Sequence, residues 1–497
     1  MKTPIIDLFA GPGGLGEGLS SYKHNNKNPF KIVLSIEKDP YAHQTLELRS
    51  FIRQFPDNEL PAEYYLYISG KITREELLKR YPKQRKTAKI EAWCAELGKR
   101  KHCEVDDRIK KALKYQKKWM LIGGPPCQAY SLAGRARMKS ANPEKFEKDH
   151  RHFLYKEYLR IIGKHKPPVF IMENVKGILS SEIKGKKIFH RILSDLQNPL
   201  NGASREKIKY NIYPLVKTKT NCPSDFIIMS EKHGIPQRRH RVIVIGIRSD
   251  IEIIPEKLRK HEQEIPLKSV ICDLPRIRSG ITKENDSFIN WHKALFSTKK
   301  ENWYYSLEPK IKKEINKTLE KIKKMDRGKE YYCKKKKRLK YQKEWFIDNR
   351  LQGVCNYTSK MHIKEDLHRY LFASCFAKVN KRSPQISDFP KSLLPKHKNI
   401  KQAMNGSMFA DRFRVQLRNS PATTITSHIS KDGHYFIHPD PTQCRSLTVR
   451  EAARVQTFPD NYFFEGRRTQ QYMQVGNAVP PLLAKQIAEI AYNIFKK

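Results

Sequence analysis

The chain has 497 residues, which is long for one typical domain and indicates two or three. Its 98 lysines and arginines outnumber its 51 aspartates and glutamates, and the formal net charge of +47 favours a polyanionic partner such as nucleic acid. The nine cysteines include no C-x-x-C pair and no cluster with histidine at metal-ligand spacing. We therefore expect reduced thiols, no metal site and no disulfide framework, and no apolar stretch is long enough to span a membrane.

The first half of the chain alternates strand and helix patterns. Helices are predicted for residues 14–22, for residues 39–52 with a start at Asp39, and around residues 72–82, where Thr73 and Glu76 form a capping-box pattern. Short apolar runs predict strands at residues 4–10, 31–37, 118–124, 168–175 and 240–248. Strands that alternate with helices predict an α/β fold with a mostly parallel sheet covered on both faces.

Two regions depart from this alternation. Residues 58–118 are charged and helix-prone, and we interpret them as an insertion. Residues 250–405 contain many lysines with interleaved aromatics, as in "EYYCKKKKRLKYQKEWF". Such a run is either a solvated or disordered segment or a folded nucleic-acid surface, and the aromatic residues favour the surface. We therefore expect one domain over residues 1–249, a second over 250–405, and a return to the first over 406–497, which ends in an amphipathic helix over Pro481–Phe495.

A glycine loop, "DLFAGPGGLG", follows the first predicted strand. Gly11, Gly13 and Gly16 match G-x-G-x-x-G, which lets backbone amides approach a ligand at a helix N-terminus. Glu37 ends the second predicted strand, where a carboxylate can accept both hydroxyls of a ribose. Nicotinamide enzymes and S-adenosylmethionine (AdoMet) enzymes share both features, so the loop alone does not separate them.

The stretch "WMLIGGPPCQAYSLAGR" places Cys127 directly after a buried strand and two prolines. Ligands of parallel sheets bind beyond the carboxyl ends of the strands, and the prolines stiffen the chain at that point. A cysteine held there is suited to be a nucleophile if its surroundings favour the thiolate. The alternative is a buried inert thiol, which Pro-Pro and Gln128 on either side disfavour.

Two further polar groups follow predicted strands. Glu173 lies at the end of "VFIMEN" and suits either an ion pair or a hydrogen bond to a heterocycle. In "QRRHRV", Arg239 and Arg241 are two residues apart, so an extended chain places them on one face. Two arginines on one face near a strand edge suit an oxygen or phosphate ligand.

Six segments in this order resemble the motif series of DNA (cytosine-5-)-methyltransferases. The segments are "DLFAGPGGLGEGL", "GGPPCQAYS", "ENV", "QRRHRV", "SLTVREAARVQTFPD" and "QVGNAVPP". The resemblance implies a Rossmann-like methyltransferase domain, AdoMet as the methyl donor and no metal. It also implies that region 250–405 is a smaller target-recognition domain, and that the closing helix packs beside the first strand.

The resemblance assigns residues to the cofactor and to catalysis. The implied AdoMet contacts are Phe9, Gly11, Gly13, Gly14, Leu15, Glu37, Pro126 and Asn477. Taken singly, Phe9 and Leu15 are better explained as core residues than as cofactor contacts. The acidic residue that the family places after its third strand is obscured by the insertion, where Asp106 and Asp107 lie in a helical pattern.

The catalytic roles that the resemblance implies agree with the chemistry of cytosine. Addition of the Cys127 thiolate to C6 makes C5 nucleophilic, while Glu173 holds the N3 and amino edge. Arg241 is expected to hold O2, and Arg239 to order the catalytic loop or a phosphate. Because C5 is inaccessible in a stacked duplex, we expect the base to be flipped and covered by a basic loop over residues 128–144.

The resulting hypothesis is an AdoMet-dependent DNA cytosine-5 methyltransferase, within a bacterial restriction–modification system or stand-alone. Double-stranded DNA is the expected partner, the expected state is a monomer, and the expected location is the cytoplasm at the nucleoid. A cytosine-5 tRNA methyltransferase is the first alternative, which the size of region 250–405 disfavours. A DNA-binding module with a decayed site is the second, which the intact Cys127, Glu173 and Arg241 disfavour.

Overall fold

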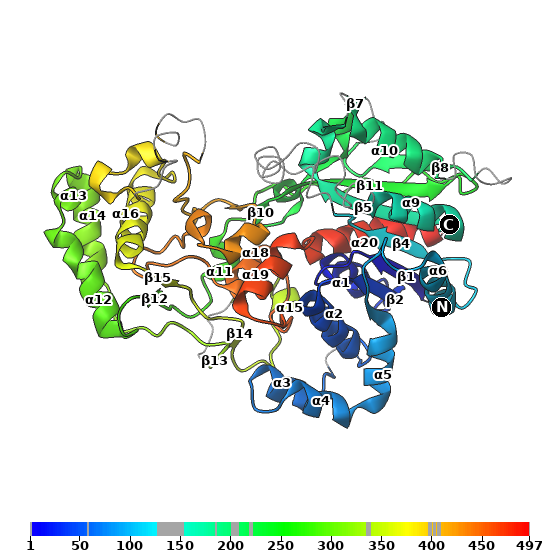
Figure 1. Ribbon diagram of the computed structural model, residues 1–497, viewed down its shortest axis with the longest axis horizontal. Coiled ribbons are helices and arrows are strands. Elements are labelled where there is room, and N and C mark those ends of the chain that lie inside the picture. The colour runs from blue at the N-terminus through cyan, green and yellow to red at the C-terminus, as the bar shows by residue number, and fades with distance from the viewer. Residues whose placement is uncertain are drawn as a thin grey trace. The chain divides into compact units, whose positions relative to one another are not determined.

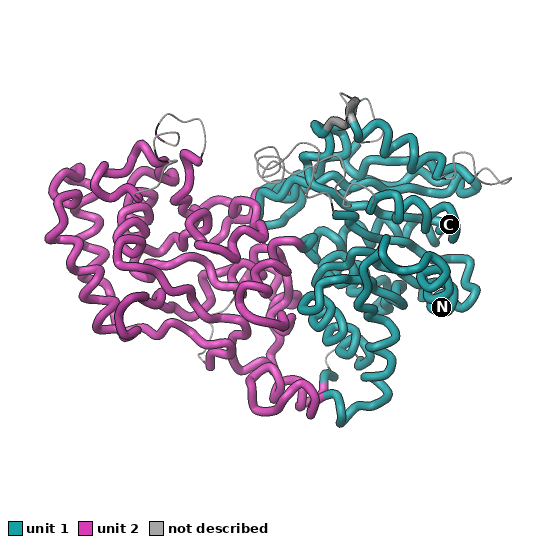
Figure 2. Tube along the Cα trace, in the orientation of Figure 1, with its two compact units in different colours: residues 1–60, 78–263, 478–497 teal, residues 61–77, 264–477 magenta. Residues whose placement is uncertain are grey.

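The computed structural model describes residues 2–56, 59–126, 154–183, 186–199, 208–217, 222–333, 339–395, 400, 404 and 409–496. The chain divides into two compact units, shown in different colours in Figure 2. Unit 1 comprises residues 1–60, 78–263 and 478–497, and unit 2 comprises residues 61–77 and 264–477. The chain therefore passes between the units at four points.

Unit 1 is built on an eight-stranded sheet of order β3-β2-β1-β4-β5-β11-β8, with β9 paired to β11 (Figure 1). Its strands are β1 (Thr3–Leu8), β2 (Phe30–Glu37), β3 (Ala92–Cys94), β4 (Met120–Gly123), β5 (Val169–Val175), β8 (Tyr210–Pro214), β9 (Ile227–Met229) and β11 (His240–Arg248). The strands from β3 to β5 run parallel, whereas β11 runs antiparallel to β5, β8 and β9. The mostly parallel α/β fold predicted from the sequence is confirmed, and each of the five predicted strands belongs to this sheet.

Helices cover both faces of the sheet. Successive side chains of β1 point to opposite faces, and those on each face pack against helices. Ile6 and Leu8 belong to a buried cluster with apolar residues of α6, α9 and α10, whereas Gly16 of α1 approaches the side chain of Asp7 on the opposite face. The helices of unit 1 are α1 (Gly14–Ser21), α2 (Pro40–Ile52), α5 (Pro82–Glu91), α6 (His102–Leu113), α9 (Leu154–His165), α10 (Ile188–Gln197) and α20 (Pro481–Lys496). As predicted, the Asp39 carboxylate caps α2 by accepting hydrogen bonds from two backbone amides.

The closing helix α20 packs on α1, the helix that follows the first strand. A Cβ at Gly18 would lie 2.2 Å from the carbonyl oxygen of Pro481 and 2.4 Å from Cβ of Ala484. Near its end, Phe495 meets Phe30 of β2 with ring centroids 6.4 Å apart. The chain's last helix is thus placed beside its first βα unit through α1, and Gly18 sets how closely the two helices approach.

Replacing Gly18 with alanine is expected to lower the free energy of unfolding by about 1–3 kcal/mol, because the new methyl group overlaps backbone atoms of α20. The shift of the urea unfolding midpoint measures this effect. Ser20→Ala on the same helix is the control, and we expect it to change stability by less than about 0.5 kcal/mol. Equal midpoints for the two variants would contradict the close packing of α1 and α20.

The predicted insertion over 58–118 is divided between the two units. Residues 78–118 belong to unit 1 and include β3, which extends the main sheet beyond β2. Residues 61–77 belong to unit 2 and hold α3 (Ala62–Ile68) and the start of α4 (Arg74–Arg80). The predicted capping box is present, since Glu76 accepts a hydrogen bond from the backbone N–H of Thr73 at 2.6 Å.

The other boundaries also differ from the prediction. The first block of unit 1 extends to Gln263, fourteen residues beyond the predicted end at 249. The predicted return at 406 differs more, because residues 406–477 lie within unit 2 and only 478–497 return to unit 1. The reason is that "SLTVREAARVQTFPD" packs within the second unit, where its helix α18 (Val449–Val455) contacts α11 (Lys268–Ile271) and α19 (Arg468–Asn477).

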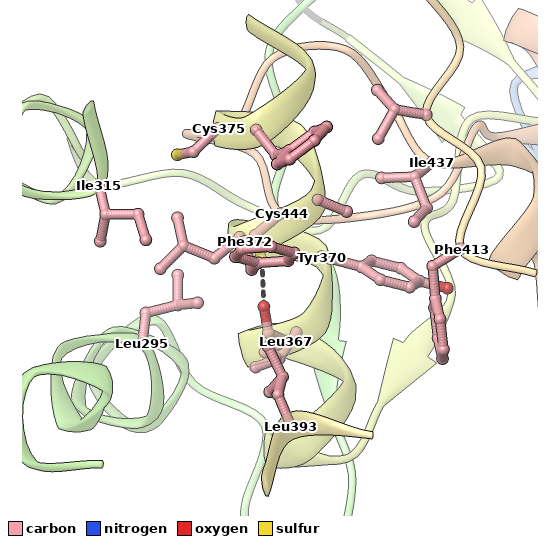
Figure 3. Packing of buried hydrophobic residues seen from close by; sticks show 14 of the residues in the cluster. Leu295, Ile315, Leu367, Tyr370, Phe372, Cys375, Leu393, Phe413, Ile437 and Cys444 are labelled. Atoms are coloured by element: carbon pink, nitrogen blue, oxygen red, sulfur yellow. Dashed lines mark hydrogen bonds between the residues drawn. The ribbon is translucent and has the colours of Figure 1, made fainter. Parts of the chain in front are cut away.

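Unit 2 is mainly helical, with short two-residue strands. Its helices include α11 (Lys268–Ile271), α12 (Phe288–Phe296), α13 (Asn302–Tyr305), α14 (Pro309–Glu320), α15 (Lys343–Phe346), α16 (Lys364–Asn380), α18 (Val449–Val455) and α19 (Arg468–Asn477). Its short strands are β12 (Gly280–Ile281), β13 (Tyr331–Tyr332), β14 (Val354–Cys355), β15 (Met361–His362) and β16 (Ala422–Thr423). Figure 3 shows α16 in a buried cluster, where Leu367 and Phe372 pack with Leu295 of α12 and Phe413.

Residues 61–77 are held in unit 2 by the tyrosines of α3. The hydroxyl of Tyr65 donates to Asp348 at 2.7 Å, and that of Tyr67 donates to Glu465 at 2.7 Å. Arg74 adds an ion pair with Glu465, with 3.6 Å between nitrogen and oxygen. These side-chain hydrogen bonds explain why a segment inserted between two strands of unit 1 belongs to the second unit.

Candidate active site

The glycine loop joins β1 to α1 at the carboxyl edge of the sheet. Phe9, Gly11 and Gly13 have positive φ angles of 55°, 57° and 91°, and glycine adopts this region without the steric cost that a Cβ brings. Gly13 is the N-cap of α1. Among the described residues, no heavy atom beyond the chain neighbours lies within 4 Å of the position of a Cβ on Gly11. The loop is therefore open beside Gly11.

The carboxylate of Glu37 fixes this loop to the end of β2. One oxygen accepts a hydrogen bond from the N–H of Gly11 at 2.8 Å, and the other accepts from Lys38 at 2.9 Å and Asp39 at 2.8 Å. Burial raises the pKa of Glu37 above its ordinary value, and the three N–H groups oppose that change. A carboxylate beside the open side of a glycine loop fits an adenosine-containing cofactor such as AdoMet.

The other loop residues predicted to touch the cofactor differ in exposure. Leu15 is 6% exposed and lies in the core at the start of α1, and Gly14 is buried as the first residue of that helix. Phe9 is half-buried and packs against the core of unit 1. Of the two interpretations open from sequence, Leu15 agrees better with core packing, whereas the ring of Phe9 is partly accessible.

The Pro-Pro segment is held against the end of β5. Gly123 ends β4, and a Cβ there would lie 2.5 Å from the carbonyl oxygen of Leu8. The amide of Asn174 donates to the carbonyl of Pro125 at 3.4 Å. Pro126 is half-buried and is the last described residue of this segment. Cys127, the predicted nucleophile, lies outside the described residues, as does the predicted basic loop 128–144.

Glu173 and Arg241 form an ion pair on neighbouring antiparallel strands. Nε of Arg241 lies 3.0 Å from Oε1 of Glu173, and both side chains are largely buried. The strand register brings them together, because Arg241 pairs with Val175 and Ile243 pairs with Glu173. The other oxygen of Glu173 would lie 3.0 Å from a Cβ on Gly124, so the carboxylate adjoins the start of the Pro-Pro segment.

Arg239 directly precedes β11 and is 1% exposed. Burial lowers the pKa of both Arg239 and Arg241, and the charge of Glu173 opposes this for each. The neighbouring Arg238 is exposed, and His240 forms an ion pair with Glu231 at 2.8 Å. Both guanidinium groups therefore interact electrostatically with the same carboxylate, and Arg241 also holds it in a direct ion pair.

Asn477 is the last residue of α19 in unit 2, where it is exposed. Its predicted contact with the cofactor stays a prediction. The same holds for the cofactor roles of Phe9, Gly11, Gly13, Gly14, Leu15, Glu37 and Pro126.

The sequence reasoning missed a carboxylate and a strand. Glu96 follows β3, which is parallel to β2, and its oxygen lies 3.5 Å from Nζ of Lys38, the residue after Glu37. It is therefore a better candidate than Asp106 for the acidic residue after the third strand, since Asp106 is engaged by Arg160 and His165, each at 2.8 Å. A three-residue strand inside a charged insertion has too little periodicity to be found from sequence.

Asp7, on β1 beneath the glycine loop, is a second missed residue. Its carboxyl is 1% exposed, and its Oδ2 has no hydrogen-bond partner among the described residues. Burial raises the pKa of Asp7 from 3.8 to about 8, with Arg53 opposing this and Glu37 adding to it. The folded chain therefore holds this carboxyl in its neutral form at pH 7.

The contribution of Asp7 to the free energy of unfolding is expected to fall as the pH rises from 4 to 8, because the folded state retains a proton on Asp7 that the unfolded chain gives up. The contribution is full below pH 4 and is lost at a slope of up to about 1.4 kcal/mol per pH unit. Asp7→Asn removes this titration. The difference between the urea midpoints at pH 5 and pH 8 should be smaller for Asp7→Asn than for the parent. The exposed control Asp107→Asn should show the same difference as the parent. Parallel behaviour of Asp7→Asn and the parent would refute the assignment.

The described residues contain neither a membrane-spanning helix nor a metal-binding cluster. None of the described helices combines the length and apolarity needed to cross a membrane. Within the described ranges, no group of three or more His, Cys, Asp or Glu side chains is arranged to hold a metal ion.

The sheet order, the glycine loop and the carboxylate at the end of β2 define a Rossmann-like fold of the kind that binds AdoMet or dinucleotides. The chain belongs to the C-5 cytosine-specific DNA methylase family, whose profile matches residues 84–493. It is therefore a member of a family of DNA (cytosine-5-)-methyltransferases, and the family resemblance drawn from the motifs is confirmed.

Individual relatives agree with this assignment. The type II methyltransferase M.Bpa9945I of Bacillus paralicheniformis is 32% identical over 511 residues, covering 99% of this chain and 98% of the relative. The type II methyltransferase M.DdeI of Desulfomicrobium norvegicum is 25% identical, covering 98% of this chain and 87% of the relative. A crystal structure described as a prophage-encoded DNA modification methyltransferase from E. coli has a TM-score of 0.53 at 17% identity over 100% of both chains, which supports the fold.

Proposed function

We propose that this protein transfers the methyl group of AdoMet to C5 of a flipped cytosine in duplex DNA, as the methylase of a type II restriction–modification system. The observation that carries the proposal is the buried ion pair of Glu173 and Arg241, 3.0 Å apart. It adjoins the Gly124-Pro125-Pro126 segment that leads into Cys127. The type II relatives, matched over nearly their full length, favour a restriction–modification role over a stand-alone one.

Cys127 supplies the nucleophile in this proposal. Its thiolate bonds to C6 of cytosine, and the electron pair of the C5–C6 double bond then becomes available at C5. A positive environment favours the thiolate over the thiol; Arg241 lies on β11 next to β5, and Arg239 directly precedes that strand. Asn174 supports the approach by holding the carbonyl of Pro125, two residues before the sulfur.

Glu173 and Arg241 bind the pyrimidine edge. The Glu173 carboxyl hydrogen-bonds N3 and the exocyclic amino group, which stabilises the charge that develops on the ring. Arg241 donates to O2 of the base and keeps Glu173 in place. Arg239 is 1% exposed, so of its two suggested roles we assign it to ordering the site and not to a phosphate.

The glycine loop and Glu37 bind the methyl donor. Bound AdoMet supplies an electrophilic methyl group, which C5 takes as S-adenosylhomocysteine is released. Glu37, whose carboxylate holds the loop amide of Gly11, would bind the ribose, and Phe9 and the glycine loop would contact other parts of the methyl donor. Loss of the C5 proton to a base then expels the Cys127 thiolate and restores the ring.

Unit 2 is the proposed DNA-recognition part. It contains most of the lysine- and aromatic-rich region, and such side chains contact phosphates and bases. The charge of +47 predicts DNA binding that weakens steeply with added salt.

The test is incubation of the protein with tritiated AdoMet and either duplex DNA or tRNA. Label in DNA, lost in Cys127→Ser while AdoMet binding is retained, is the expected result. Label only in RNA would show a tRNA methyltransferase, and no label would show a binding module. Cys222→Ser, at an exposed cysteine, is the control and should retain activity. Bisulfite sequencing of a plasmid from cells that express the protein then gives the target site.

A further inference from the structure

A pocket with a volume of about 320 Å³ opens on unit 1, at the edge of the sheet opposite the proposed active site. Its walls are the end of α6, the segment that leads into β4, the end of α9 and the end of β11. Lys166 lines the pocket just before β5 begins, whereas Glu173 lies near the end of that strand. Seven residues of extended chain span about 20 Å, so the pocket is separate from the site around Glu173.

Unusual backbone conformations shape the rim of this pocket. Lys114, Tyr115 and Lys166 have φ angles of 49°, 63° and 51°, a region that bulky residues seldom adopt. Lys114 is the C-cap of α6, and Lys166 directly follows α9. Both helices thus end at the pocket, and Lys110 and His165 from their last turns are among the residues that line it.

Basic side chains dominate the lining. They are Lys110, Lys117, His165, Lys166 and Arg248. Arg248 is paired with Asp250 at 2.7 Å, and His165 with Asp106 at 2.8 Å. Lys110 and Lys117 form no ion pair or hydrogen bond through their side chains within the described ranges. The nearby carboxylates of Asp250 and Asp106 are therefore already in ion pairs, and the charges of Lys110 and Lys117 are not neutralised by them.

The electrostatics of His165 agree with this picture. Burial lowers its pKa, and the charges of Arg160 and Lys110 act in the same direction, while Asp106 opposes them. A concave site where cations repel one another attracts an anion, because the low-dielectric walls concentrate the field.

Two aromatic side chains complete the lining. Trp119 is 3% exposed and forms part of the buried wall, whereas Tyr115 is 99% exposed at the rim. An accessible ring beside lysines is the combination that binds a nucleobase by stacking and its phosphate by charge. The pocket is also within the size range of small-ligand sites.

We propose that this pocket binds a phosphorylated nucleotide, with its phosphate against Lys110 and Lys117 and its base against Tyr115. The nucleotide comes either from a free mononucleotide or from a DNA strand outside the active site. Both share the same chemistry, and the experiment distinguishes them.

Calorimetric titration tests the proposal on the full chain, with the AdoMet site saturated by S-adenosylhomocysteine. The probes are deoxyadenosine monophosphate and a thymidine tetranucleotide. The variant is Lys110→Gln/Lys117→Gln, and the matched control is Lys111→Gln/Lys118→Gln, which removes the same charge from exposed neighbours that do not line the pocket.

At least a tenfold loss of affinity in the pocket variant, with less than a twofold change in the control, is the expected result. Loss for the mononucleotide identifies a free nucleotide as the ligand, and loss for the tetranucleotide alone identifies a DNA strand. Equal losses of affinity in both double variants would show that only the overall positive charge matters, and would overturn the proposal. The absence of binding by the parent would overturn it as well. Tyr115→Ala should weaken binding of whichever probe responds, since it removes the stacking ring.

Discussion

Substituting glutamine for Glu173 is expected to lower the rate of methyl transfer by about 10²–10⁴-fold, the range typical for loss of a positioned acid–base group. Glutamine keeps the shape of the side chain but cannot stabilise the protonated N3 of the pyrimidine as a carboxylate does. It also leaves Arg239 and Arg241 without the charge that opposes the effect of their burial. Single-turnover transfer of tritium from AdoMet to duplex DNA measures the rate.

Glu231→Gln is the matched control for this experiment. Glu231 pairs with His240, the residue between the two arginines, at 2.8 Å, so its removal alters the same strand without touching the ion pair of Glu173. AdoMet affinity should stay within about twofold in both variants, because neither residue lies in the glycine loop. A Glu173→Gln protein that keeps more than a tenth of the parent rate would remove Glu173 from the catalytic assignment.

The largest expected effect on stability is that of Arg454→Met, which should cost about 3–5 kcal/mol. Arg454 of α18 lies between two buried carboxylates, with Nη2 at 3.1 Å from Asp273 and 2.7 Å from Asp460. The exposed fraction of all three side chains is 3% or less. Removing the guanidinium leaves two carboxylates facing each other, and burial already raises the pKa of Asp273.

Chemical unfolding followed by circular dichroism measures this loss. The exposed Arg467→Met is the control and should be nearly neutral. Adding Asp273→Asn and Asp460→Asn to Arg454→Met should recover part of the loss, since the remaining charges are then removed. A triple variant less stable than Arg454→Met would show that packing, and not charge, sets the cost.

The sequence allowed the main sheet to be predicted because its strands are strongly patterned. Runs such as Val169–Met172 are buried on both faces, and Asp39 is a cap with a clear signature. The three-residue β3 has no such pattern, and it was missed. The division of the insertion between the two units could not be predicted. It depends on tertiary hydrogen bonds of Tyr65 and Tyr67 to residues that are 283 and 398 positions away in the sequence.

The individual residues of the candidate site could be predicted from the sequence, but the ion pair between them could not. Alternation placed Arg239 and Arg241 on one face, yet the ion pair of Arg241 with Glu173 depends on the register of β11 against β5. That register is set by packing across the sheet and not by either strand alone. The burial of Arg239 and the neutral carboxyl of Asp7 depend on neighbouring elements in the same way.

Under the proposal that unit 2 reads the DNA target, the four chain passages between the units have a consequence for transplanting sequence specificity among relatives. A graft of residues 264–477 alone would leave behind residues 61–77, and with them the tyrosine donors to Asp348 and Glu465. Two separate gene segments would have to be exchanged together for the recipient to keep these hydrogen bonds. Recombination that alters the DNA sequence read by such an enzyme is therefore expected to have matching breakpoints on both sides of α3.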